Sequence, residues 1–228
     1  MKNKNLLLLA LFLCLFLVSS LALYHKNMYK DAYAYLKVKL FKSINKDIVH
    51  LKLKPDNLAD KSKEAYQFIQ NNGYDTTHAI LIDFSIHSGK NRFYVWDYNE
   101  NKAIIKGLVA HGYGNENFRS TQEKIVFSNV PNSYTSSLGK YKIGVRAPSQ
   151  WGTKIHYKMH GLEKTNNKAF SRIIVLHSYS QMPDHEIYPE HIPLGYSQGC
   201  PVIDNKTMEK MDSLLKNKTK PVLLWIYN

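Results

Sequence analysis

The residues best suited to chemistry surround the second of the chain's two cysteines, Cys200, in the motif S-Q-G-C-P at positions 197–201. A cysteine attacks a carbonyl as its thiolate, but an ordinary thiol, with a pKa near about 8.5, is mostly protonated at neutral pH. The thiol therefore needs a base, and histidine is the usual one. His177 directly follows the apolar run 173–176, which would hold its backbone firmly. This pair indicates nucleophilic acyl transfer.

The neighbours of the pair strengthen this interpretation. Ser178 could orient the imidazole of His177, and Gly199 permits a sharp turn and close approach by a substrate. The amides of Gly199 and Cys200 could point at a developing oxyanion. Each residue also has an ordinary structural explanation, because a histidine at a strand end is often structural and a lone thiol can be a small buried hydrophobe. The combination favours catalysis.

The elements that must position these residues belong to a β-rich fold. A helix is predicted from Pro55 to Gly73, capped by Asp56 or Asn57 and ended by glycine in a left-handed conformation. After Gly73, short apolar segments alternate with Gly, Asn, Ser and Pro clusters, which is typical of a β-rich domain. The predicted fold is α+β, mainly β, with one later helix at 206–216 and strands at 78–84, 92–98, 103–111, 125–128, 140–145, 172–176, 202–203 and 222–227.

The N-terminus indicates export. Leu6–Leu23 is an apolar run of 18 residues, preceded by Lys2 and Lys4. At about 1.5 Å per residue it barely covers a bilayer core of about 30 Å, so a cleaved signal peptide and an uncleaved inner-membrane anchor both remain open. Either one predicts a periplasmic or cell-envelope location. The expected organisation is a leader at 1–23, a basic helical lead-in at 24–72 and a catalytic domain at 73–228.

The composition narrows the classes of protein. Apolar residues make up 44% and charged residues 21%, which excludes a disordered or collagen-like chain. Two cysteines cannot build a disulfide framework or a four-cysteine zinc site. The net charge of +13 suits an acidic partner, and export argues against a nucleic acid.

The motifs together resemble the L,D-transpeptidases of bacterial cell walls, the YkuD-like domain, in the branch with glutamine before Gly-Cys-Pro. The resemblance covers about residues 78–204. It is carried, in order, by LIDFSIHSGKNRFYVWDY (81–98), LVAHGYG (108–114), FSN (127–129), SSLGKYKIG (136–144), HGLEKTNNKAFSRIIVLHS (160–178) and LGYSQGCPVI (194–203). The last motif is the most specific. The resemblance implies a sandwich-like core of mixed and antiparallel β-sheets with a few helices.

The resemblance also implies roles for particular residues. Cys200 matches the family's nucleophile, His177 its base, and Ser178 the residue that positions the base. Gly199 and Gln198 belong to the oxyanion turn. The implied substrates are peptidoglycan stem peptides, cleaved with release of a terminal D-amino acid and joined to an amine in a 3–3 cross-link, or to water in an L,D-carboxypeptidase. No cofactor or metal is implied.

Substrate contacts are less well defined. Ser197 lies in the same motif. His111 is expected at the end of a strand beside the cleft, where it could face substrate or belong to a structural turn. The branch usually has arginine where this chain has Tyr196. If that arginine binds a substrate carboxylate, either Tyr196 acts differently or Arg172 or Arg146 compensates. Substrate preference is therefore open.

Two rival functions remain. A zinc hydrolase could draw ligands from the residues near Cys200, but these sit in a Pro-punctuated loop without an HExxH helix. They are His177, Asp184, His185, Glu186, Glu190 and His191. A non-catalytic wall-binding module would explain the positive charge, but it would leave His177 and Cys200 without a purpose.

Overall fold

The computed structural model describes residues 58–114 and 125–228, which lie in a compact unit spanning Asn57–Asn228. The first element is helix α2, Leu58–Asn72, with Ala65 and Ile69 fully buried on its apolar side. It ends where predicted, because Gly73 adopts a φ of +70°. The expected caps, Asp56 and Asn57, lie outside the described residues.

Eight strands and a second helix follow α2. Helix α3 begins after Asp204, whose carboxylate accepts a hydrogen bond from the Thr207 amide at 2.9 Å. The elements are β1 (His78–Asp83), β2 (Phe93–Asp97), β3 (Lys102–Gly107), β4 (Gly139–Pro148), β5 (Ile155–Gly161), β6 (Val175–Ser178), β7 (Val202–Ile203), α3 (Asn205–Leu215) and β8 (Leu223–Tyr227). The described residues therefore have the expected mainly β composition.

All of these strands form one sheet in the order β3-β2-β1-β8-β4-β5-β6-β7. The pairs β1/β8 and β6/β7 are parallel, and the other neighbours are antiparallel. An isolated bridge joins Ala110 to Val202, with the Ala110 amide donating to the Val202 carbonyl at 2.8 Å. The segment after β3 thus meets the strand at the other end of the sheet, so the sheet nearly closes on itself.

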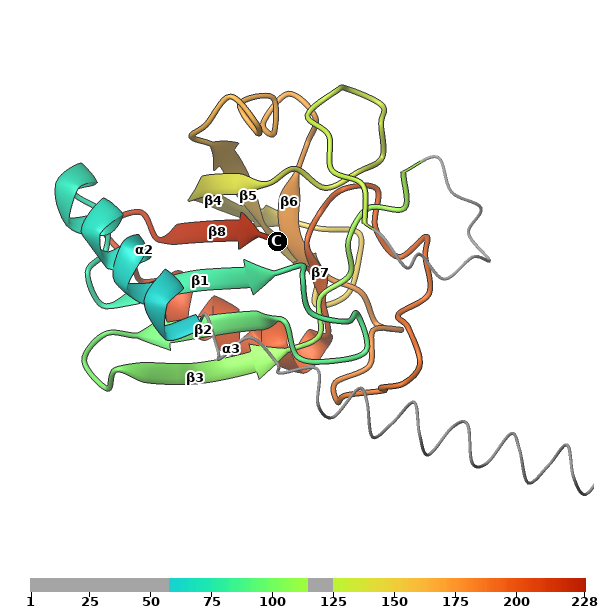
Figure 1. Cartoon of the computed structure of the whole chain (residues 1–228), viewed down its shortest axis with the longest axis horizontal. Coiled ribbons are helices and arrows are strands. Elements are labelled where there is room, and N and C mark those ends of the chain that lie inside the picture. Colours follow the sequence, from blue (N-terminus) through green and yellow to red (C-terminus); the bar gives the residue numbers. More distant parts are fainter. Residues whose placement is uncertain (1–57, 115–124) are drawn as a thin grey trace, which may run out of the picture. The chain divides into compact units, whose positions relative to one another are not determined.

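The central strand β1 is buried on both faces because the helices cover opposite sides of the sheet (Figure 1). Ala79 and Leu81 pack with α2, whereas Ile80 and Ile82 point into the main core with Met208 and Met211 of α3. A strand covered on both sides needs apolar residues at successive positions, which explains the unbroken run 79–82.

Two predicted strands were wrong, the strand predicted at 103–111 ends earlier, at Gly107, and one strand was missed. Residues 125–128 form a loop, because the Ser128 carbonyl accepts a hydrogen bond from the Arg172 guanidinium at 2.9 Å instead of joining the sheet. The segment predicted at 172–176 becomes a strand only at Val175, since Ile173 has a φ of +57°. Strand β5 was missed, although apolar and polar residues alternate along it.

The described residues hold no helix long and apolar enough to cross a membrane. The apolar run Leu6–Leu23 lies outside them. Helix α2 packs on β1 and β8 within the compact unit. The predicted organisation instead placed this helix in the basic lead-in at 24–72, outside the catalytic domain.

Candidate functional site

The pairing of β6 with β7 places the predicted base beside the predicted nucleophile. His177 is the third residue of β6, and it pairs in parallel with Val202 of β7. Its amide lies 3.5 Å from the carbonyl of Pro201, the residue that follows Cys200. Residues far apart in the sequence therefore meet at one edge of the sheet, and both side chains line the same cavity.

The turn before Cys200 needs glycine at position 199. Gly199 has a φ of +116°, which side-chain-bearing residues rarely adopt, and a Cβ there would lie 2.6 Å from the Thr135 carbonyl oxygen. The Gly199 carbonyl accepts a hydrogen bond from the Ser136 hydroxyl at 3.2 Å. The close approach predicted for Gly199 is thus made by the protein's own backbone.

Ser197 holds this turn from within. Its buried hydroxyl accepts a hydrogen bond from the Gly199 amide at 3.0 Å and donates to the Cys200 carbonyl at 2.5 Å. The hydroxyl of Ser197 therefore holds the turn, and Ser197 also lines the cavity together with the exposed Gln198.

The expected pair of oxyanion amides is reduced to one. The Gly199 amide is already engaged by the Ser197 hydroxyl. Within the described part of the chain, no acceptor is hydrogen-bonded to the Cys200 amide. That amide is the donor that a developing negative charge at Cys200 could use.

The thiol of Cys200 lies against the backbone of the segment leading into β6. The Val175 amide donates to Sγ at 3.4 Å, and Sγ lies 3.7 Å from the Ile173 carbonyl oxygen. Burial raises the pKa of the thiol, while the Val175 amide and the charge of Arg172 oppose that rise. Cys200 therefore rests as a neutral thiol at neutral pH.

The imidazole of His177 is fixed through one nitrogen. Its Nδ1 lies 3.0 Å from the backbone carbonyl oxygen of Ser178, which can only accept, so Nδ1 carries the proton and Nε2 has the free lone pair. Burial lowers the pKa of His177, and the nearby His156 lowers it further, against the effect of the Ser178 carbonyl. Burial thus favours a neutral ring, and no residue in the described ranges is hydrogen-bonded to its acceptor nitrogen, Nε2.

The side chain of Ser178 does something other than predicted. Its buried hydroxyl accepts from the Thr153 amide at 3.0 Å and lies 3.3 Å from the Thr153 hydroxyl. Gly152 approaches so closely that a Cβ there would lie 2.1 Å from the Ser178 Oγ. The backbone carbonyl of Ser178 orients the base, while its side chain secures the 149–154 loop.

The cavity over this pair has a volume of about 520 Å³. One wall is aromatic, with ring centroids 5.8 Å apart for Trp151 and Tyr179 and 5.1 Å apart for Tyr179 and Tyr196. Tyr196 therefore lies at the site in an apolar setting. Among the described residues that line the cavity, none carries a permanent charge.

Sequence reasoning missed His156, which lines the cavity beside His177. The signal was the alternation of Ile155, Tyr157 and Met159 with polar residues, which is typical of a half-buried strand. Because this segment was not predicted to be a strand, nothing indicated that His156 would face the cavity.

The predicted arginine contacts are not made at the cavity. Arg172 donates to the carbonyl of Thr135 at 2.7 Å and to the hydroxyl of Ser137 at 2.6 Å, so its guanidinium holds the 128–137 loop behind Cys200. Arg146 pairs with Asp212 at 2.6 Å. Neither arginine is among the described residues that line the cavity, so neither is placed there to compensate for Tyr196.

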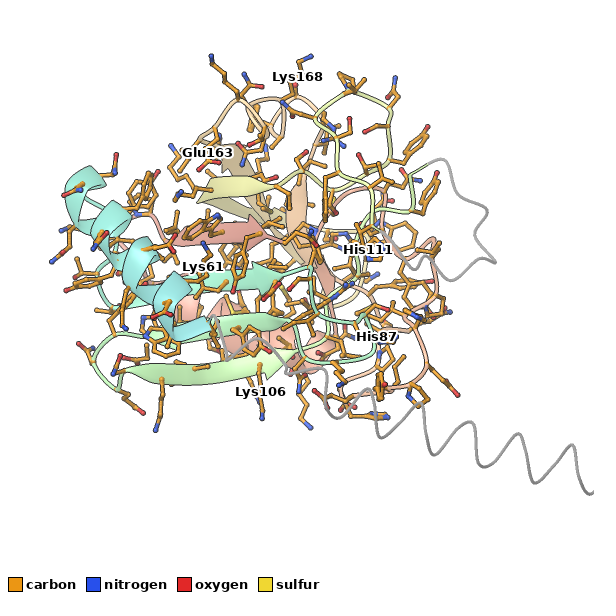
Figure 2. The ribbon with its side chains drawn as sticks, in the orientation of Figure 1. Lys61, His87, Lys106, His111, Glu163 and Lys168 are labelled. Atoms are coloured by element: carbon orange, nitrogen blue, oxygen red, sulfur yellow. The ribbon has the colours of Figure 1, made fainter. Side chains whose placement is uncertain are left out.

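His111 is also not among the described residues that line the cavity. It is buried beyond the carboxyl end of β1, where Arg92 Nη2 donates to its Nδ1 at 3.0 Å (Figure 2). The Phe84 ring packs edge-on against it at 5.9 Å. A substrate-facing role for His111 is therefore replaced by a structural one.

The described residues contain no group of three or more His, Cys, Asp and Glu side chains arranged to hold a metal ion. His191, considered above as a zinc ligand, instead lies with its Nε2 2.9 Å from the Nε2 of His87. His185 pairs with its neighbour Asp184 on the surface.

The neutral state of the thiol can be tested by alkylation. We expect the rate of iodoacetamide labelling at Cys200 to rise about tenfold per pH unit between about pH 6 and 8, because only the thiolate reacts and the thiol pKa is raised. Peptide-level mass spectrometry separates Cys200 from Cys14. A labelling rate independent of pH across this range would reveal a thiolate–imidazolium pair and contradict this assignment.

Comparison with known proteins identifies the family of this chain. A family model described as the L,D-transpeptidase catalytic domain matches residues 51–227. No curated protein matches the chain.

Two solved structures are similar at 12% identity. One is the helical cell shape determining protein Pgp2 from Campylobacter jejuni, with a TM-score of 0.44, covering 67% of this chain and 48% of that one. The other is the L,D-transpeptidase (residues 123–326) from Xylanimonas cellulosilytica, with a TM-score of 0.35, covering 71% and 68%. The chain thus spans about half of the Campylobacter protein, and at these TM-scores the likenesses carry no argument. By its match over residues 51–227, the chain belongs to the L,D-transpeptidase catalytic domain family.

Proposed function

We propose that this protein is an exported cysteine acyltransferase that acts on peptidoglycan stem peptides. The observation that carries the proposal is the meeting of Cys200 and His177 at one cavity, with the imidazole anchored through Nδ1 so that Nε2 can accept a proton. Membership of the family supports the substrate class. The apolar run Leu6–Leu23 motivates the export and a periplasmic or envelope location.

The first half-reaction follows from the neutral state of the pair. The thiol proton passes to Nε2 of His177 as the sulfur attacks the carbonyl of the L-centre of the stem's diamino acid. The Cys200 amide stabilises the oxyanion. The intermediate collapses with breakage of the peptide bond, the imidazolium gives its proton to the leaving amine, and a terminal D-amino acid departs. The product is a thioester on Cys200.

The second half-reaction resolves the thioester. Attack by an amine of a neighbouring stem forms a 3–3 cross-link and returns the thiol. Attack by water would make the protein an L,D-carboxypeptidase, which is the alternative. A non-catalytic wall-binding module is less well supported, because it would not need an anchored base beside a thiol.

Substrate binding relies on neutral contacts in this proposal. With Tyr196 in place of the branch's arginine, the described lining of the cavity offers an aromatic wall together with Gln150, Gln198 and two histidines. Aromatic walls suit the apolar parts of a peptide or the faces of a sugar, and amides suit its polar backbone.

Removing the nucleophile should abolish turnover. We expect Cys200→Ala to release no terminal amino acid from tetrapeptide muropeptides while keeping the wild-type melting temperature within a few degrees. Cys14→Ala, the other cysteine of the chain, is the matched control and should retain full activity. His177→Ala should lose about 10²- to 10⁴-fold in rate, the usual contribution of a positioned base. Sustained turnover by Cys200→Ala would overturn the proposal.

A milder effect is expected at Ser178. Ser178→Ala leaves the carbonyl that orients His177 but removes the acceptor of the Thr153 amide, so we expect a few-fold loss in kcat and about 1–3 kcal/mol of destabilisation. Thr153→Val is the control, because it removes only the weaker hydroxyl contact. A loss of turnover as large as that of His177→Ala would mean that the Ser178 hydroxyl, and not its carbonyl, supports the base.

A further inference from the structure

A second imidazole stands beside the predicted base. His156 of β5 is directly opposite His177 of β6 in the antiparallel register. Directly opposite residues share a face of the sheet, with Cβ atoms about 4.5–5.5 Å apart. Both side chains line the cavity that contains Cys200. The cavity therefore holds two groups able to carry a proton near neutral pH, whereas attack by a thiol needs one.

Both imidazoles are influenced by a backbone carbonyl. The Ser178 carbonyl accepts a hydrogen bond from Nδ1 of His177 at 3.0 Å, and the Pro148 carbonyl acts on the His156 ring to raise its pKa. Each neutral ring thus keeps one nitrogen with a lone pair. Burial lowers the pKa of His156, and the charge of Lys158 lowers it further, against the effect of the Pro148 carbonyl.

The groups around His156 favour its neutral form. Lys158 lies two residues after His156 on β5, and His177 of β6 faces His156. The thiol of Cys200 and the phenols of Tyr179 and Tyr196 complete the titratable lining of the cavity among the described residues. No carboxylate lines the described part of the cavity, so nothing there would stabilise an imidazolium at His156. A proton taken up by His156 would therefore be released readily.

Counting protons shows where a second base is needed. An alkyl amine titrates near about 10.4 and reaches the site as an ammonium ion, R–NH₃⁺. It must lose one proton before it can attack the thioester and another as the amide forms. The second proton can travel through His177 to the departing sulfur, which restores the thiol. The first proton of the ammonium ion has no group to accept it if His177 is the only base. Water needs no such recipient, because it attacks as a neutral molecule: one of its protons reaches the sulfur through His177 and the other stays on the carboxylic acid that forms.

We propose that His156 takes the first proton from an acceptor amine that arrives as an ammonium ion. The thioester is thereby transferred to amines in preference to water. The inference rests on the proposed function and deepens it, because it selects the cross-linking reaction over the carboxypeptidase alternative. In the complete step the C–N bond forms, the C–S bond breaks, one proton returns to Cys200, and one leaves the site from His156 to solvent.

The test is the ratio of transfer to hydrolysis within single reactions of the full-length protein in mild detergent. Tetrapeptide muropeptide is the donor and the acceptor, and mass spectrometry counts cross-linked dimer against tripeptide monomer. His156→Gln keeps a donor for the Pro148 carbonyl but cannot take up a proton. We expect this variant to lower the ratio at pH 7 by about tenfold or more, at little cost to hydrolysis. Both products form from the same thioester, so a smaller amount of folded protein lowers both and leaves their ratio unchanged.

Two controls sharpen the result. His160→Gln alters another histidine of β5, which stacks on Phe170 outside the cavity, and should leave the ratio unchanged. Methoxyamine is already neutral at pH 7, so His156→Gln should spare transfer to it. Alkaline pH should likewise restore transfer to the stem amine in the variant.

The inference fails if His156→Gln leaves the ratio unchanged, or if transfer to methoxyamine falls as steeply as transfer to the stem amine. Tripeptide alone from the wild-type protein would also overturn it and leave the carboxypeptidase alternative. Absence of any Cys200-dependent product would instead overturn the proposed function.

Discussion

The site depends on the short parallel pairing between β6 and β7. This pairing sets His177 beside Val202, places the Pro201 carbonyl at the amide of His177, and lets the Val175 amide reach the Cys200 sulfur. The turn that leads into β7 is held by Ser197 and admits only glycine at position 199. The bridge from Ala110 to Val202 secures the other side of β7, so the strand that follows the Cys200 turn is fixed by the near-closure of the whole sheet.

Burial then sets the protonation states. It raises the thiol pKa and lowers the imidazole pKa, which favours the neutral form of both groups. In the proposed mechanism the proton therefore moves only when a carbonyl is attacked. A thiol that stays protonated at rest is less open to oxidation, which suits an unpaired cysteine. In the proposed transfer to amines, His156 would act as a second base while His177 is occupied by the proton that returns to Cys200.

Much of this arrangement could be predicted from the sequence. The turn motif around Cys200, the mainly β composition after Gly73 and the helix ending at Gly73 depend on local sequence signals, and the structure keeps them. Contacts across the sheet could not be predicted. Arg172 serves the 128–137 loop, His111 is held by Arg92, and the Ser178 hydroxyl bonds Thr153, because each partner is distant in the sequence. His156 was missed for the same reason, since only the register of β5 on β6 brings it to the cavity.

The central claim is that Cys200 carries the acyl group of a stem peptide. The most direct measurement is the mass of the full-length protein, quenched in acid during turnover of tetrapeptide muropeptide and then digested to locate any adduct. The account predicts that the peptide containing Cys200 gains the mass of the donor minus its terminal amino acid, and that this adduct disappears as product forms. Turnover without an adduct on Cys200, or with an adduct on another residue, would contradict it.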